Sequence, residues 1–404
     1  MEVFVARQPI FDRQQKVYAY ELLFRSGLDN FFDHQDENQA SSKVITDSFL
    51  SIGLEKLTGG KRAFINFTKD LLLKEYATLF PKQLTVVELL ENVEPTMEII
   101  EACQNLKDLG YLLSLDDFVY DKKFEPLIDL ADIIKVDFIQ TTGKKRNAFV
   151  RDFAPRDIKL LAEKVETAEE FKQAKAMGYT YFQGYFFSKP VIISRKDIPG
   201  SKLNYLQLLQ EVNRPELDFG RIESVIKREV SISYKLLKYI NSALFGLRRE
   251  VESIRQALAL LGENNFKKWI SLIALAGMGE DKPVELVISS IIRAKFCEAL
   301  SDKVGLSDRS QDLFLLGMFS MIDAIIDRPM PDILAELPIS DDIKGTLLGE
   351  TNRLASVYES IIAYEKGNWA KFSETAAQLR LDEGAVPAIY EESVEWANQL
   401  SELA

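Results

Sequence analysis

The sequence predicts a multidomain protein, with an α/β TIM-like (β/α) barrel followed by an all-α domain. In the first half, short apolar runs rich in β-branched and aromatic residues alternate with helical or loop stretches, which favours parallel strands joined by crossovers. In the second half, apolar residues recur at helical spacing instead. Pro190, Pro199, Gly200 and Ser201 separate the two patterns like a linker, so we expect domains at 1–195 and 196–404.

The expected strands of the barrel are apolar runs that carry polar residues near their C-terminal ends. They are VYAYELLF (17–24), RAFINF (62–67), LTVVELL (84–90), YLLSLDDF (111–118), IIKVDFI (133–139), IKLLAEKV (158–165) and TYFQGYFF (180–187). Three helices are expected between them, at Ser41–Leu57, at Pro95–Leu109 before Gly110, and at Thr167–Met177 before Gly178.

The second half shows several apolar stripes at helical spacing. One stripe contains Leu206, Leu209 and Val212, and later stripes begin near Ile222 and Leu236. A further helix is expected from a cap at Ser253 to a stop at Gly262. Packing of these stripes against one another predicts an α bundle.

Composition argues against several functions. The chain has 404 residues and a net charge of −12, which argues against a protein whose task is to bind DNA. We find neither a signal peptide nor an apolar run of ~20 residues, so we expect a cytoplasmic protein without membrane insertion. Cys103 and Cys297 lie far apart in apolar helical patterns, which is typical of reduced, buried thiols.

Polar residues at successive strand ends predict a site at one mouth of the barrel. They are Glu21, Asn66, Glu88, Asp116, Lys135, Glu163 and Gln183. Convergent carboxylates need a cation, and oxygen ligands suit Mg²⁺ or Mn²⁺, as one or two ions. Taken singly, an acid at a strand end is more often a helix cap or part of a surface ion pair, and Asn66 alone could be a cap. The ordered series favours the metal site.

These residue types also suggest roles in phosphodiester hydrolysis. Asp117 adjoins Asp116, so a turn at the strand end could bring both carboxylates to the metal centre. Glu163 could take a proton from the attacking water, while Lys135 could hold that water or offset charge on the phosphate. Arg25 could bind a phosphate oxygen with its guanidinium group.

Motifs in the first 190 residues occur in the order typical of one family. They are QPIFD at Gln8, ELLFR at Glu21, INF at Asn66, ELLE at Glu88, DDF at Asp116, KVD at Lys135, AEKVE at Glu163 and QGYFFSKP at Gln183. This region resembles an EAL domain, the bacterial phosphodiesterase barrel that opens cyclic di-GMP to linear pGpG.

The resemblance implies roles for individual residues. Glu21, Asn66, Glu88 and Asp116 would bind metal, and Asp117 and Glu163 would serve a second metal and the water, assisted by Lys135. The residues implied to hold the nucleotide are Gln8, Arg25, Asp137 and Gln183. Glu91 and Glu166 would support the loops. EAL barrels commonly pair, which implies a possible homodimer through the barrel.

Two departures from the EAL pattern leave a second function open. Leu22 replaces the signature alanine, so extra bulk stands beside a metal ligand. The loop after Asp117 reads FVYDKKF where the family has FGTGYSS, and Val119 and Tyr120 do not readily adopt the positive φ that glycine allows. The alternative to the enzyme is therefore a catalytically inactive cyclic di-GMP receptor or a protein-interaction scaffold.

The second half resembles an HDOD domain, a helical relative of the HD phosphohydrolases. The resemblance rests on LLKYINSALFGLRREVESIRQALALLGENNFKKWISLIAL (236–275), LFLLGMFSMIDAI (313–325) and AYEKGNW (363–369). An HD metal site needs histidine, and the single histidine of this chain is His34, in the first half. The helical domain therefore cannot be a histidine-ligated hydrolase. The resemblance implies a regulatory or interaction module with an unknown protein partner.

Overall fold

The computed structural model of the chain describes residues 3–26, 54–116, 121–187, 200–214, 216–228, 237–238, 240–241, 251 and 254–401. The chain divides into two compact units. The first comprises Met1–Phe187 with Ala363–Lys371, and the second comprises Ser188–Ile362 with Phe372–Ala404. His34 and Asp117 lie outside the described residues.

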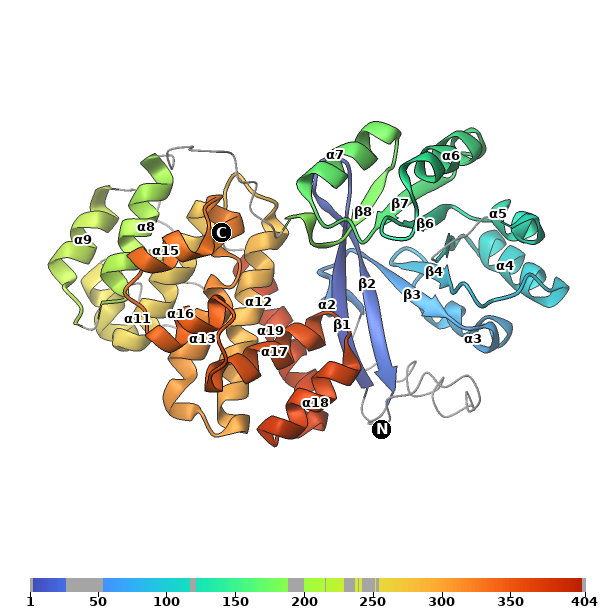
Figure 1. Cartoon of the computed structure of the whole chain (residues 1–404). Coiled ribbons are helices and arrows are strands. Elements are labelled where there is room, and N and C mark those ends of the chain that lie inside the picture. Colours follow the sequence, from blue (N-terminus) through green and yellow to red (C-terminus); the bar gives the residue numbers. More distant parts are fainter. Residues whose placement is uncertain are drawn as a thin grey trace. The chain divides into compact units, whose positions relative to one another are not determined.

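The first unit contains a closed barrel whose strands are hydrogen-bonded in chain order (Figure 1). The strands are β1 (Val3–Phe11), β2 (Val17–Ser26), β3 (Arg62–Phe67), β4 (Thr85–Leu89), β5 (Leu112–Leu115), β6 (Ile133–Asp137), β7 (Lys159–Glu163) and β8 (Tyr181–Gln183). The α/β barrel predicted from the sequence is confirmed.

One strand of the barrel was missed by the sequence analysis. β1 is antiparallel to both of its neighbours, β2 and β8, while the pairs from β2 to β8 are parallel. The expectation of a wholly parallel sheet was therefore wrong at β1. Arg7 and Pro9 interrupt the apolar pattern of β1, and proline lacks a backbone hydrogen-bond donor. The sequence of this segment therefore does not predict a strand.

Short helices connect the strands on the outside of the barrel (Figure 1). They are α2 (Leu54–Thr58), α3 (Lys69–Leu73), α4 (Met97–Leu109), α5 (Glu125–Ile128), α6 (Gly143–Phe153) and α7 (Ala168–Met177). The helices α4 and α7 end before Gly110 and Gly178, as predicted. Of the helix expected at Ser41–Leu57, residues 41–53 lie outside the described residues.

The barrel has two apolar cores because successive side chains of a strand point to opposite faces. The larger core joins the outer faces of the strands to the helices. The smaller core consists of residues that face one another inside the barrel: Ile10, Ala19, Phe64, Val86, Ile133 and Leu161. The interior is thus packed at this level and closed to solvent, which leaves the mouth for polar residues.

The second unit is helical where the structure describes it. Its helices are α8 (Gly200–Val212), α9 (Phe219–Arg228), α11 (Ile254–Met278), α12 (Val284–Leu300), α13 (Ser310–Phe319), α14 (Ile322–Ile326), α15 (Met330–Glu336), α16 (Asp341–Leu347), α17 (Arg353–Glu365), α18 (Trp369–Leu379) and α19 (Val386–Ser401). The last residues of α17 and the first residues of α18 belong to the first unit. The all-α expectation is confirmed. α8 already begins at Gly200, inside the expected linker. Gly262 is not helical (φ 69°, ψ 167°) and separates two helices within the range of α11, so the helix stop predicted at Gly262 is confirmed.

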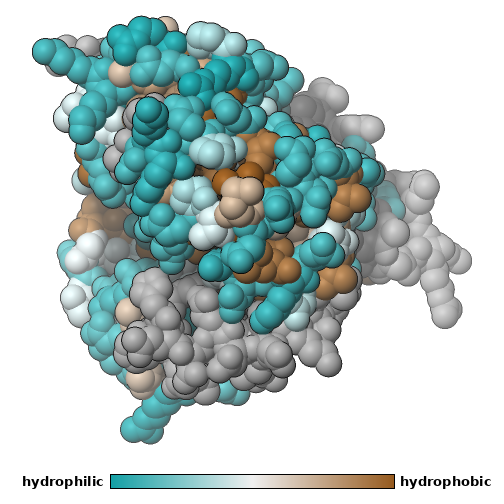
Figure 2. Space-filling model, turned by 90° about the vertical axis from the view of Figure 1, so that its right-hand side faces the viewer, coloured by the Kyte–Doolittle hydropathy of each residue, from teal (hydrophilic) through white to brown (hydrophobic). Residues whose placement is uncertain are grey.

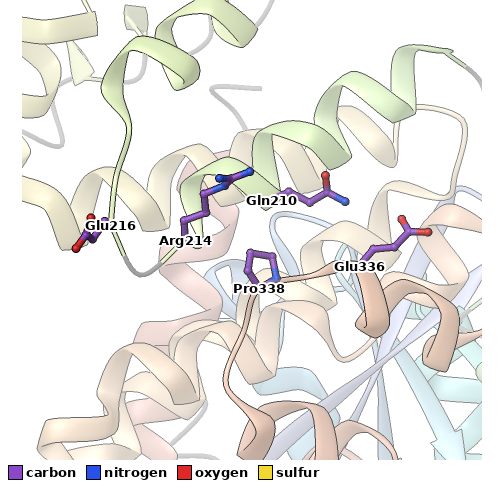
Figure 3. A pocket seen from close by; sticks show the side chains of 5 residues that line it. All are labelled: Gln210, Arg214, Glu216, Glu336 and Pro338. Atoms are coloured by element: carbon purple, nitrogen blue, oxygen red, sulfur yellow. The ribbon is translucent and has the colours of Figure 1, made fainter.

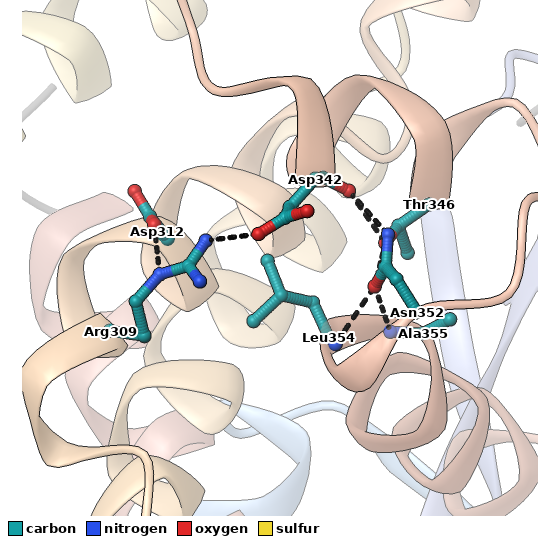
Figure 4. Close-up of polar contacts among 7 residues, drawn as sticks. All are labelled: Arg309, Asp312, Asp342, Thr346, Asn352, Leu354 and Ala355. Atoms are coloured by element: carbon teal, nitrogen blue, oxygen red, sulfur yellow. Dashed lines mark hydrogen bonds and ion pairs between the residues drawn. The ribbon is translucent and has the colours of Figure 1, made fainter.

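A polar network joins three helices of the second unit near its surface (Figure 4). Arg309 donates hydrogen bonds to Asp312 at 2.6 Å and to Asp342 at 2.8 Å. Asn352 accepts from the backbone N–H groups of Leu354 and Ala355 and so caps the start of α17. The network connects the segments around α13, α16 and α17.

The surface in Figure 2 is mostly hydrophilic, with hydrophobic residues gathered in small groups. Large hydrophobic residues that remain exposed on the first unit are Leu73, Leu79, Met97, Leu109, Ile139 and Tyr185. Within the described part of the chain, we find no helix that is long and apolar enough to cross a membrane.

Candidate active site

The polar residues at the strand ends face the inside of the barrel because of their spacing from the inner core. Glu21, Asn66 and Glu88 each follow an inner-core residue of the same strand by two positions. Lys135 and Glu163 do the same on β6 and β7. Since side chains alternate with a period of two, the charged layer lies directly above the apolar layer.

The ammonium group of Lys135 lies among four carboxylates. Its Nζ is 2.5 Å from Glu88 Oε1, 2.7 Å from Glu163 Oε1, 2.9 Å from Asp116 Oδ1 and 3.5 Å from Glu21 Oε1. The Lys135 side chain is 1% exposed, so these charges interact where water screens them little. We call Lys135 with these four acids the Lys135 cluster.

The charge balance of the Lys135 cluster shifts the pKa values of its members. Burial raises the pKa of Glu88 well above its ordinary value and that of Glu163 to about 8, against the opposing effect of Lys135. Burial would lower the pKa of Lys135, but the surrounding carboxylates raise it well above its ordinary value. Lys135 thus stays charged, whereas Glu88 and Glu163 bind a proton more tightly than exposed acids do, chiefly because burial disfavours their charged forms and secondly because of the neighbouring carboxylates.

The donor set fits a hard divalent cation. Asn66 Oδ1 is buried and has no hydrogen-bond partner among the described residues, so an amide oxygen is available as a ligand beside the carboxylates. Oxygen donors of this kind suit Mg²⁺ and Mn²⁺. No group of three or more His, Cys, Asp or Glu side chains in the described ranges is spaced to hold a metal, since the carboxylates gather around the Lys135 ammonium.

Two glutamines connect β1 and β8 to the Lys135 cluster. Gln183 donates from Nε2 to Glu21 Oε2 at 2.5 Å and to Gln8 Oε1 at 3.1 Å. The Gln183 Oε1 atom is buried and lacks a hydrogen-bond partner among the described residues. Gln183 therefore orients Glu21, and its carbonyl oxygen remains an acceptor for a ligand.

The other residues expected around the site lie in different environments. The guanidinium of Arg25 is buried and stacks 5.1 Å from the ring centroid of Phe4. Asp137 is buried and binds Lys164 together with two backbone amides. Glu91 and Glu166 are exposed. Asp117 cannot be placed, as it lies outside the described residues.

The bulk of Leu22 does not point toward the ligands. Leu22 is fully buried in the outer core with Tyr20, on the opposite face of β2 from Glu21. The expectation that its side chain stands beside a metal ligand was therefore wrong, because neighbours in a strand face opposite sides. Of the altered loop, Val119 and Tyr120 lie outside the described residues, and Asp121 caps the short helix at Lys122–Phe124.

Two residues near the Lys135 cluster were missed in the sequence. Ser114 is fully buried on β5, two positions before Asp116 and opposite Glu88 in the ladder. Because side chains two residues apart on a strand face the same side, this spacing could have placed Ser114 beside the site from the sequence alone. Lys164 follows Glu163 with a φ of +54° and binds Asp137. A lysine that follows a strand is usually exposed to solvent, so nothing in the sequence around Lys164 predicted its contact with Asp137.

The second unit has a cavity of about 800 Å³ beside α8 and the end of α15 (Figure 3). It is lined by Gln210, Arg214, Glu216, Glu336 and Pro338. Arg214 is paired with Glu211 at 2.9 Å, and Glu336 with Arg328 at 3.0 Å. These pairs already neutralise two of the charged groups in its wall, so the cavity is a weaker candidate than the barrel mouth.

Comparison with known proteins confirms the family resemblance of both halves of the chain. The EAL domain family matches residues 28–190, and the HDOD domain family matches residues 198–337. The uncharacterized protein YuxH of Bacillus subtilis is 41% identical over 99% of this chain and 99% of its own length. The cyclic di-GMP phosphodiesterase CdgJ of Vibrio cholerae is 34% identical over 99% of this chain and 93% of its own.

Among solved structures, a standalone EAL protein from Vibrio cholerae O395 with bound c-di-GMP is 26% identical. The match covers 46% of this chain and 92% of that one, with a TM-score of 0.37. The two relatives that span almost the whole length carry the assignment. The chain belongs to the family of proteins in which an EAL domain is followed by an HDOD domain.

Proposed function

We propose that the barrel hydrolyses cyclic di-GMP to linear pGpG with Mg²⁺ or Mn²⁺. The observation that carries this proposal is the convergence of Glu21, Glu88, Asp116 and Glu163 on Lys135 at the barrel mouth. A relative that matches 99% of the chain is named a cyclic di-GMP phosphodiesterase, which supports the same substrate.

In the proposed reaction, water attacks one phosphorus atom of the cyclic dinucleotide, the bond to the 3′ oxygen breaks, and that oxygen takes up a proton to become the 3′ hydroxyl of pGpG. Glu21, Asn66, Glu88 and Asp116 would hold the cation, which supplies charge stabilisation at the attacking and leaving oxygens. Glu163 is the candidate base for the proton of the water, and Lys135 holds its carboxylate at 2.7 Å. Gln183 keeps Glu21 oriented.

The test is incubation of the purified chain with cyclic di-GMP and Mg²⁺ or Mn²⁺, followed by chromatography of the nucleotides. We expect pGpG from the wild type and at least a 100-fold slower reaction from Glu21→Ala, in line with the loss of a group that stabilises the transition state. Glu94→Ala is the matched control, because Glu94 is an exposed acid of the same barrel that pairs with Lys123 at 3.0 Å.

The receptor alternative predicts a different result from the same samples. The sequence of the loop after Asp117 favours it, since FVYDKKF lacks glycine. Binding of cyclic di-GMP at micromolar concentration without pGpG would contradict the enzyme and support a receptor. Ca²⁺ should permit binding without turnover, because it is larger and less demanding in geometry than Mg²⁺.

The proposal extends to location and partners. We place the reaction in the cytoplasm, and we assign the helical domain to regulation or to binding of a protein partner. A homodimer through the barrel is part of the same proposal, and light scattering of the purified chain with and without cyclic di-GMP tests it.

A further inference from the structure

Lys164 has a backbone conformation that is unusual for its residue type. It follows the last residue of β7 with a φ of +54°, in the left-handed region where a side chain clashes with its own backbone. Conformations of this kind persist when surrounding contacts hold them, and they gather at functional sites. The contacts of Lys164 are therefore informative.

The ammonium of Lys164 binds a buried carboxylate. Its Nζ lies 2.5 Å from Asp137 Oδ2, and the Asp137 side chain is 6% exposed while that of Lys164 is 46% exposed. The other oxygen, Asp137 Oδ1, accepts from the backbone N–H groups of Ile139 at 2.6 Å and Gln140 at 2.9 Å. With both carboxylate oxygens already engaged by the chain, Asp137 is better suited to holding the loop than to binding a nucleotide.

The residues on either side of Lys164 are fixed in opposite directions. Glu163 is directed inward to Lys135, and its carbonyl oxygen accepts from the N–H of Phe138 at 3.1 Å. Val165 is fully buried on the outer side and donates its N–H to the carbonyl of Gln183. The left-handed conformation of Lys164 lets the chain pass from Glu163, which faces inward, to Val165, which is buried on the outer side.

We propose that Lys164, through its ion pair with Asp137, is a positioning residue that holds the ends of β6 and β7 so that Glu163 points to the Lys135 ammonium. Asp137 and Glu163 stand opposite each other in the β6–β7 ladder, so the pair joins the two strands at the level of the candidate base. The effect of the Lys164–Asp137 pair on kcat rests on the proposed function, whereas its effect on the stability of the strand ends does not.

The kinetic test compares three substitutions at one position. Because small displacements of a base cost large factors in rate, Lys164→Ala should lower kcat about 10-fold or more with KM within about threefold. Lys164→Arg keeps the charge and should keep kcat within about threefold of the wild type. Lys164→Gly adopts the left-handed conformation without strain but lacks the pair, so its kcat should stay low.

Lys159→Ala is the matched control. Lys159 lies at the other end of β7, is 47% exposed and also pairs with an aspartate, Asp157, at 2.6 Å. Asp157 is 91% exposed, so this pair holds no buried group, and kcat should not change. An unchanged kcat in Lys164→Ala, a raised KM alone, or full recovery in Lys164→Gly would each overturn the proposal.

Hydrogen exchange measured without substrate separates this proposal from the proposed function. Peptides covering 133–140 and 160–166 should exchange faster in Lys164→Ala than in Lys159→Ala, because the hydrogen bond from Phe138 to Glu163 is loosened. Faster exchange supports the positioning role even if the wild type forms no pGpG. Equal exchange in the two variants contradicts it even if the wild type is active.

Discussion

A cation lies between carboxylates in both units, but in different surroundings. Lys135 is 1% exposed and has four acidic partners, one of which, Glu88, is fully buried. Arg309 is 31% exposed and has two acidic partners, Asp312 and Asp342, which are 29% and 51% exposed (Figure 4). Water therefore screens the charges around Arg309 more than those of the Lys135 cluster.

The comparison shows why only one of the two groups is suited to chemistry. The hydrogen bonds that Arg309 donates to Asp342 and Asp312 raise its pKa, and the guanidinium keeps its charge in any case. In the Lys135 cluster, burial and excess negative charge bring the pKa of Glu163 to about 8, near the working range of a general base. The surface group connects helices, while the buried group holds charge that a metal or substrate can use.

The largest effect is expected when the buried cation is removed. Lys135→Met leaves the carboxylates without a counter-ion, which should cost about 3–5 kcal/mol of barrel stability without metal. The measurement is hydrogen exchange of peptides from β4 to β7 at rising urea in EDTA. Mg²⁺ or Mn²⁺ should restore part of the loss.

Lys123→Met removes a cation that is 47% exposed, and it should change barrel stability little. If Lys135→Met lowered barrel stability as little as Lys123→Met does, burial would not explain a difference between the two lysines.

The next effect depends on pH. The pKa of Glu163 is raised from 4.5 to about 8 in the folded chain, so its stabilising contribution is complete below about pH 4.5 and is lost as pH rises through about 8. In EDTA, barrel stability should fall between these values by up to about 1.4 kcal/mol per pH unit. Glu163→Gln should flatten this dependence, and an identical slope in both proteins would contradict the raised pKa.

A smaller effect is expected at the cap of α17. Asn352 Oδ1 accepts from the N–H groups of Leu354 and Ala355 at 2.9 and 3.0 Å, so Asn352→Ala leaves both without this acceptor. The loss should be about 1–2 kcal/mol, read from exchange of peptides covering α16 and α17. Asn352→Asp keeps an acceptor oxygen and should retain most of the stability. Equal losses in both variants would argue against capping.

The smallest effect is expected at the exposed cation. Arg309→Met should cost less than about 1 kcal/mol, because ion pairs that face water contribute little and are screened by salt. The same exchange measurement at low and high salt tests this, and the difference from wild type should shrink at high salt. A loss as large as that of Lys135→Met would remove the distinction between the two groups.

Much of the barrel could be predicted because its pattern is local. Strand and helix propensities, the glycines after α4 and α7, and the two-residue period are all present in short segments of sequence. The same period places Glu21, Glu88, Lys135 and Glu163 at the ends of strands whose inner faces converge. The inference about Leu22 failed because the alternation of faces was not applied to it. The expectation of a wholly parallel sheet failed because β1 was not recognised as a strand.

By itself, the sequence determined the order of elements, the charged residues of the mouth and the lack of histidine in the helical half. Only the tertiary structure decided that β1 closes the barrel between β2 and β8, that Lys135 is the cation the carboxylates share, and that Lys164 binds Asp137. The physical reason is that these features depend on distances between residues far apart in the chain. Local propensity specifies which side chains face inward, but closure of the barrel determines which of them meet.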